Sequence, residues 1–268
     1  MEIAAHIDAL ERDGALLADA ADAAGLTASV PTCPGWQVRD LVRHQAYVHH
    51  WAARHVIERP PAVLGEDDED VILASGPDDA ELVSAYRIGH TALVAALRMA
   101  DPDLDCPMFM PAPSPLAFWA RRQAHETAIH RYDAESAAPG GAPAPRDAFG
   151  TAFADDGIDE LIMGFAARRR YRLRGDGTRS LTVRATDTGS GWRISLAGGA
   201  TTVTRCGDAG DRVDTDTDTA SGNCLLQGPA TGIYAYLWNR GDATAAAVTV
   251  TGDPATLGVW RSSVRVTW

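Results

Sequence analysis

Residues 118–135 read FWARRQAHETAIHRYDAE and carry more information on the fold than any other stretch of this 268-residue chain. Their apolar residues recur at helical spacing, which predicts a long helix with a buried face. Glu126 and His130 are four residues apart, so both side chains lie on one face and can reach a common point. That pair suits a divalent metal, although a helical Glu-His pair is more often a solvated contact.

Helical spacing also marks three earlier stretches of the chain. They cover residues 3–17, 38–51 and 82–97, and the last follows the start signal Pro77-Asp78-Asp79. Helices of this length joined by turns predict an antiparallel four-helix bundle.

The second of these helices contains a histidine, His44, on an otherwise apolar face. Alone, a histidine there is usually structural. Together with Glu126 and His130 it gives two imidazoles and one carboxylate projecting inward from two helices. This set, with a free fourth position, is typical of a catalytic zinc site. His125 falls on a different face of its helix and is not expected to be a ligand.

After residue 170 the apolar pattern alternates with period two, which predicts strands. We therefore expect two domains: a four-helix bundle over residues 1–168 and a small α+β domain over residues 169–268. The expected strands are 180–185, 192–196 and 248–251, with further short strands at Val203 and Val213. Residues 214–219 are expected to form an edge strand or a loop. Helices are expected over residues 157–168, 229–238 and 253–260.

Composition excludes several classes of function. The 24 basic residues against 36 acidic residues give a net charge of -12, which argues against a general nucleic-acid or anionic-membrane surface. The chain has no lysine, which excludes Schiff-base, Walker-lysine and Ser-Lys chemistry. Its four cysteines form no C-x-x-C motif, and no signal peptide or membrane span is evident, so we expect a cytoplasmic protein.

Three motifs together resemble one protein family. Residues 30–44 read VPTCPGWQVRDLVRH, residues 118–135 contain FWARR, HE and DAE at a regular spacing, and residues 228–253 contain GPA, LWNR and TGD. This combination resembles the mycothiol-dependent maleylpyruvate isomerase family over nearly the whole chain.

The resemblance implies a DinB-like four-helix bundle followed by a C-terminal α+β domain similar to sterol carrier proteins. It implies that His44, Glu126 and His130 are the ligands of zinc or another divalent metal, and that mycothiol is the thiol cosubstrate. The expected activity is addition of the mycothiol thiolate to an electrophilic small molecule, giving either cis–trans isomerisation of a maleylpyruvate-like substrate or S-transfer. A bacterial cytosolic monomer or homodimer is expected.

Two departures from the family pattern keep the substrate open. Residues 106–113, CPMFMPAP, stand where the family commonly has an aromatic-rich stretch, and Asn239 replaces the usual glycine of LWGR. Two other classes of function remain as alternatives: a non-catalytic small-molecule binding protein whose metal is structural or absent, and a metal hydrolase that needs no thiol.

Several further residues are weaker candidates. Arg240 is predicted to be catalytic by clamping a substrate carboxylate, against an ordinary surface role. Asp133 either orients a ligand imidazole or is a surface charge. Cys33 is a nucleophile or a packing residue, and Trp36 and Trp119 belong to the core or to a pocket wall.

Overall fold

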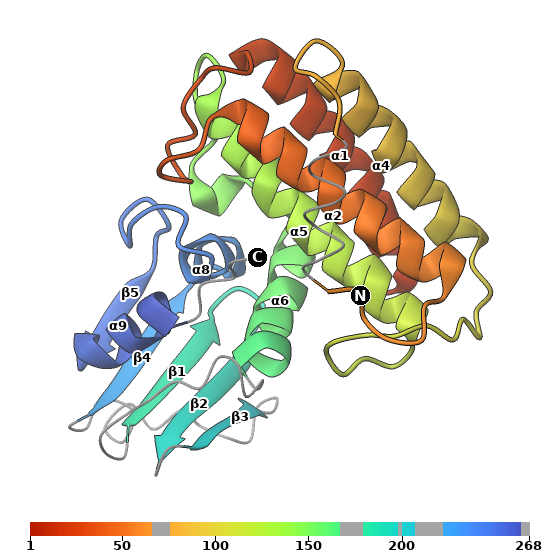
Figure 1. The fold of residues 1–268 in the computed structure, drawn as a ribbon. Coiled ribbons are helices and arrows are strands. Elements are labelled where there is room, and N and C mark those ends of the chain that lie inside the picture. Colours follow the sequence, from red (N-terminus) through yellow and green to blue (C-terminus); the bar gives the residue numbers. More distant parts are fainter. Residues whose placement is uncertain (66–75, 167–178, 198–199, 207–221, 264–268) are drawn as a thin grey trace. The chain divides into compact units, whose positions relative to one another are not determined.

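The computed structural model describes residues 1–65, 76–166, 179–197, 200–206 and 222–263 (Figure 1). It divides into two compact units, Met1–Ala142 and Pro143–Trp268. The domain boundary predicted at residue 168 lies outside the described residues, as do the predicted strand at Val213 and the Asp/Thr stretch 214–219.

The described residues of the first unit form a bundle of four long helices, which confirms the predicted fold class. Its interior is apolar, with Leu10, Leu17, Leu41 and Trp119 fully closed to solvent. Such burial of one stripe per helix is what drives bundle formation. The helices are α1 (Ile3–Ala24), α2 (Val38–Glu58), α4 (Leu82–Met99) and α5 (Pro115–Ala137).

The helix directions differ from the antiparallel prediction. Within the described residues, α1 packs on α4 and α5, and α2 packs on the same two helices. The pairs α1/α5 and α2/α4 run parallel, because later residues of one helix contact later residues of the other. The contacts that fix this are His6–His125 and Asp13–Arg131 for the first pair, and Arg43–Asp79 and His49–His90 for the second. Two successive helices that run parallel require a long connection, and residues 59–81 separate α2 from α4 along the chain.

In the part of the second unit that the structure describes, helices combine with a five-stranded mixed sheet, in agreement with the predicted α+β class. The strand order is β3-β2-β1-β4-β5; β1 and β4 pair in parallel and the other neighbours antiparallel. The strands are β1 (Arg179–Ala185), β2 (Gly191–Ala197), β3 (Ala200–Cys206), β4 (Asn223–Gly228) and β5 (Thr249–Gly252). The helical segments are η1 (Pro145–Asp147), α6 (Thr151–Asp159), the π-helix η2 (Glu160–Ala166), α8 (Ala230–Leu237) and α9 (Pro254–Ser263).

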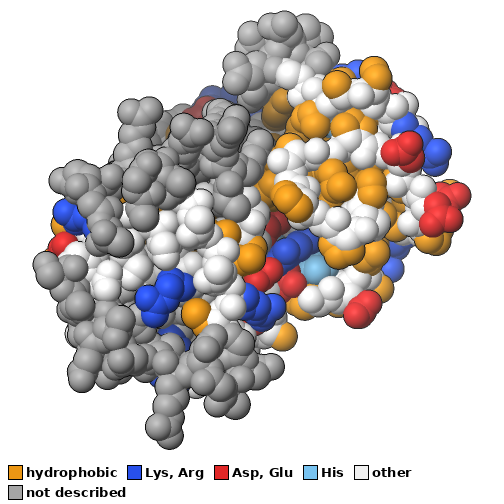
Figure 2. All heavy atoms as spheres, turned by 90° about the horizontal axis from the view of Figure 1, so that it is seen from below, with side chains coloured by type: hydrophobic (Ala, Val, Ile, Leu, Met, Phe, Trp, Pro, Cys, Tyr) orange, Lys and Arg blue, Asp and Glu red, His pale blue; other side chains and the backbone are white. Residues whose placement is uncertain are grey.

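The surface of the described residues includes some large apolar side chains. Ile57, Ile88 and Met99 are each more than half exposed. Figure 2 shows a face on which apolar side chains gather in one area, with acidic and basic side chains around it. Within the described ranges, no helix combines the length and the apolar character that crossing a membrane would require.

Candidate metal centre

The structure brings His44, Glu126 and His130 together inside the bundle. The Nε2 atom of His44 lies 3.4 Å from Glu126 Oε1, and Nε2 of His130 lies 3.2 Å from the same oxygen. One potential ligand atom from each residue lies within 4.8 Å of the other two. Helix α2 supplies the first residue and α5 the other two, because α2 crosses α5 where positions 126 and 130 face it. The side chains of His44, Glu126 and His130 are at most 10% exposed, so water competes little for a bound cation.

A buried arginine holds the far side of Glu126. Arg122, one turn earlier on α5, donates from Nη2 to Glu126 Oε2 over 2.7 Å, and both side chains are closed to solvent. The two carboxylate oxygens therefore have different partners: Oε2 faces the guanidinium and Oε1 faces the two imidazoles. Arg122 was not among the predicted site residues, although its spacing of four residues from Glu126 was a usable signal.

The cluster carries charge despite its burial. Burial alone would raise the pKa of Glu126, but hydrogen bonds with His130 and His44 and the charge of Arg122 hold it well below its usual range. Burial alone would lower the pKa of His130, yet hydrogen bonds with Asp133, Cys33 and Glu126 raise it well above its usual range. Burial lowers the pKa of His44. A carboxylate anion with a neutral imidazole is a suitable donor set for a divalent cation, and the neighbouring imidazole can join once it gives up a proton.

An aromatic side chain from the loop between α1 and α2 covers the imidazoles. The Trp36 ring stacks on His130 with an interplanar angle of 13° and a centroid distance of 6.3 Å, and it meets His44 edge-on at 5.3 Å. Trp36 is partly exposed, whereas Trp119 is fully buried in the core. Trp36 is therefore a wall of the cluster.

Cys33 and Asp133 lie on the other side of His130. Asp133 is fully buried, so it is not a surface charge. Its Oδ2 atom lies 2.9 Å from Nδ1 of His130 and accepts a hydrogen bond from the Cys33 thiol over 3.2 Å. Cys33, His130 and Asp133 thus form a second group whose atoms are close enough to share a cation, and it overlaps the first group at His130.

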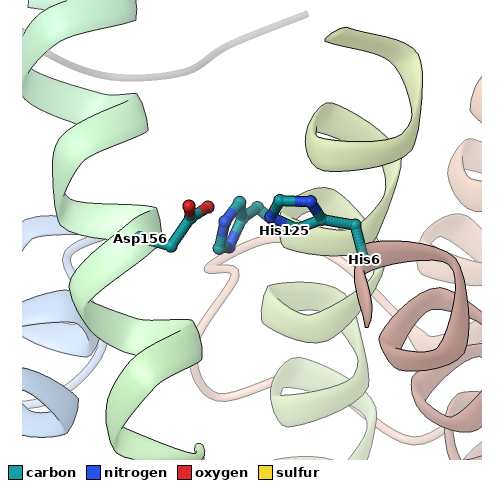
Figure 3. Close-up of side chains that lie close together, drawn as sticks. All are labelled: His6, His125 and Asp156. Carbon is teal, nitrogen blue, oxygen red and sulfur yellow. The ribbon is translucent and has the colours of Figure 1, made fainter. Parts of the chain in front are cut away.

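Two other predicted residues have contacts of their own. Arg240 follows α8 in the second unit, and its Nη1 donates to the carbonyl of Trp238 over 2.8 Å. His125 is buried on a different face of α5 and lies beside His6 of α1, with ring centroids 6.0 Å apart (Figure 3).

Fold and site together define a two-part protein whose helical bundle gathers two imidazoles and a carboxylate at one point, followed by a small α+β unit. Residues 7–135 match the family model of the mycothiol maleylpyruvate isomerase N-terminal domain, and residues 152–258 match the model of the MDMPI C-terminal domain. The chain belongs to the mycothiol maleylpyruvate isomerase family.

Solved structures with the same fold are those of a mycothiol-dependent maleylpyruvate isomerase. Its crystal structure is 12% identical in sequence, with 93% of both chains covered and a TM-score of 0.65. A histidine-to-alanine mutant of a mycothiol-dependent maleylpyruvate isomerase has the same identity and coverage and a TM-score of 0.63. At this identity the likeness concerns the fold. Comparison with curated protein sequences gave no match.

Proposed function

We propose that this protein is a zinc-dependent enzyme that uses mycothiol against an electrophilic small molecule in the cytoplasm. The observation that carries the proposal is the convergence of His44 Nε2, Glu126 Oε1 and His130 Nε2 in a nearly dry part of the bundle. Membership of a family named for a mycothiol-dependent isomerase supports the choice of thiol and reaction class.

His44, Glu126 and His130 would hold the metal. A bound divalent cation in such a site favours the thiolate form of a thiol near neutral pH, because its charge stabilises the anion directly. Arg122 contributes by keeping Glu126 ionised and by occupying its second oxygen, which directs Oε1 toward the imidazoles. Trp36 contributes by excluding water from one side of the ligand atoms.

Two reaction classes fit this site. In a cis–trans isomerisation the thiol adds to an activated double bond and leaves again after rotation, so it is regenerated. In an S-transfer it stays bonded to the product. Isomerisation has the direct support of the family name. Arg240 remains our proposed binding residue for a substrate carboxylate, since a guanidinium suits that group.

Metal content and thiol dependence test the proposal together. Purified protein should hold about one zinc per chain, and His44→Ala and Glu126→Ala should each lose it. Wild type should then convert maleylpyruvate only when mycothiol is present, and Arg240→Met should raise KM more than Arg240→Lys does. A wild type that stays metal-free after zinc is supplied would refute the metal site. Turnover without any thiol would instead favour the hydrolase class.

A further inference from the structure

His130 belongs to two overlapping groups of possible ligands, and its two ring nitrogens point into different ones. Nε2 lies 3.2 Å from Glu126 Oε1, on the side of His44. Nδ1 lies 2.9 Å from Asp133 Oδ2, on the side of Cys33. An imidazole nitrogen that carries a proton cannot bind a metal. The hydrogen-bond partner of the protonated nitrogen therefore decides at which of the two groups the remaining nitrogen can bind a metal.

Asp133 fixes that choice. Oδ2 already accepts a hydrogen bond from the Cys33 thiol, so it is an acceptor in this cluster, and the 2.9 Å contact assigns the role of donor to Nδ1 of His130. The carboxylate is fully buried, and it lies one turn after His130 on the same helix, so neither partner can turn away easily. Nε2 is then the nitrogen presented toward Glu126 and His44.

The same oxygen of Asp133 also anchors the loop that carries Trp36. The Cys33 thiol donates to Oδ2 over 3.2 Å. One residue earlier, the Thr32 hydroxyl lies 3.1 Å from the Ser136 hydroxyl, which itself donates to the Asp133 carbonyl over 2.6 Å. The loop is therefore tied to the end of α5 at the residue that orients the imidazole.

We propose that Asp133 is a positioning residue of the metal site, because it orients His130 so that Nε2 faces His44 and Glu126. By accepting a hydrogen bond from the Cys33 thiol, Asp133 also keeps Cys33 from acting as a metal ligand. This inference rests on the proposed zinc function and deepens it. Orientation of a metal-bound histidine by a carboxylate is worth about 10- to 100-fold in metal affinity.

Zinc affinity of three variants, measured by competition with a chromogenic chelator, tests the inference. Asp133→Asn keeps the shape but can donate to Nδ1, so its zinc affinity should fall by about 10- to 100-fold. Cys33→Ser keeps a donor toward Asp133 and should bind zinc within about threefold of wild type, in line with its proposed role as donor. Glu126→Gln should lose zinc. Equal affinity of Asp133→Asn and wild type, or strong loss in Cys33→Ser, would overturn the inference.

A measurement on the unaltered protein covers the case in which Asp133→Asn fails to fold. In zinc-loaded protein carrying ¹⁵N-labelled histidine, the coordinated nitrogen of His130 should be Nε2, with the proton on Nδ1. Coordination through Nδ1 would overturn the inference while leaving the zinc function intact. A wild type that binds no zinc would overturn the proposed function, and the inference with it.

Discussion

Glu126 illustrates how a single side chain can keep a charge in the interior of a bundle. Its side chain is 1% exposed, so removal from water alone would favour the neutral acid. Arg122 behind it and the two imidazoles in front reverse this, and the pKa of the carboxyl falls well below its usual range. The residue can therefore offer an anionic oxygen without solvent, which is the condition for holding a cation there.

His49, next to this cluster, behaves in the opposite way. It is a fully buried residue of α2; Nε2 lies 2.8 Å from the Thr127 hydroxyl of α5, and Nδ1 has no hydrogen-bond partner among the described residues. Burial, with a smaller effect of His90, lowers its pKa well below the usual range. His49 is therefore neutral in the folded protein at pH values where the unfolded chain already binds a proton.

This difference predicts a loss of stability in acid. Below pH of about 6.5 the unfolded state takes up a proton at His49 that the folded state refuses, which costs up to about 1.4 kcal/mol per pH unit. Above that pH both states are neutral and the effect disappears. The free energy of unfolding, measured with urea at pH 7.5, 6.5 and 5.5, should therefore decrease less with falling pH for His49→Gln than for wild type.

His50→Gln, at the exposed next position of α2, controls for the same histidine-to-glutamine change outside the core. Identical pH dependence of His49→Gln and wild type would contradict the assignment of this effect to His49.

The sequence predicted part of this residue-level arrangement. Helical spacing alone placed Glu126 and His130 on one face, and with His44 it proposed the set of three that the structure brings together. The partners behind them, Arg122 and Asp133, were missed or left open, because a motif fixes positions along a helix but not which rotamer each side chain adopts. Cys33 and Asp133 are a hundred positions apart, so only the folded chain reveals their contact.

At the scale of the elements, the bundle depends on close contact between α1 and α4. Gly14 of α1 lies where the His90 ring of α4 packs, and a Cβ there would overlap that ring. The His90 Nε2 atom lies 3.0 Å from the Leu10 carbonyl oxygen, and the Tyr86 hydroxyl donates to the Gly14 carbonyl over 3.2 Å. The His90 ring, held by its hydrogen bond to Leu10, therefore leaves no room for a side chain at position 14.

Replacement by alanine should therefore change the stability of the protein in opposite directions at two helical glycines. Gly14→Ala should destabilise the protein by about 1–3 kcal/mol, since the His90 ring must move and strain its hydrogen bond. Gly89→Ala on α4 meets open space and should stabilise by about 0.5–1 kcal/mol, because alanine loses less backbone entropy in a helix. Thermal unfolding of both variants compares them directly; stabilisation by both would contradict the close packing at Gly14.

Helices and strands were predicted where the spacing of apolar residues is regular, and missed where burial on both faces leaves no such regular spacing. The described bundle helices α1, α2, α4 and α5 follow the apolar stripes seen in the sequence. Strand β4 was not predicted, because Cys224, Leu225 and Leu226 are buried on both faces and show no alternation. The direction of the helices was also missed, since a stripe of apolar residues is the same whichever way its helix points.

At the scale of the whole molecule, the chain consists of two compact units with different roles in the proposal. All three proposed ligands belong to Met1–Ala142, and Arg240 belongs to Pro143–Trp268. A ligand that binds only the folded form of one unit stabilises that unit by mass action, by about 2.7 kcal/mol at a free concentration one hundred times its Kd. Zinc should therefore stabilise the first unit, which holds the proposed ligands, more than the second.

Hydrogen exchange with and without zinc tests this difference. With zinc at about one hundred times its Kd, backbone amides of α2 and α5 should exchange up to about 100-fold more slowly, because their opening must release the metal. Amides of β1, β2 and β4 should keep their rates, since no proposed ligand lies in that unit. Glu126→Gln should show no response in either unit. Equal slowing of the sheet and the bundle would mean that the two units open together, and no slowing in α2 and α5 would argue against a metal held by His44, Glu126 and His130.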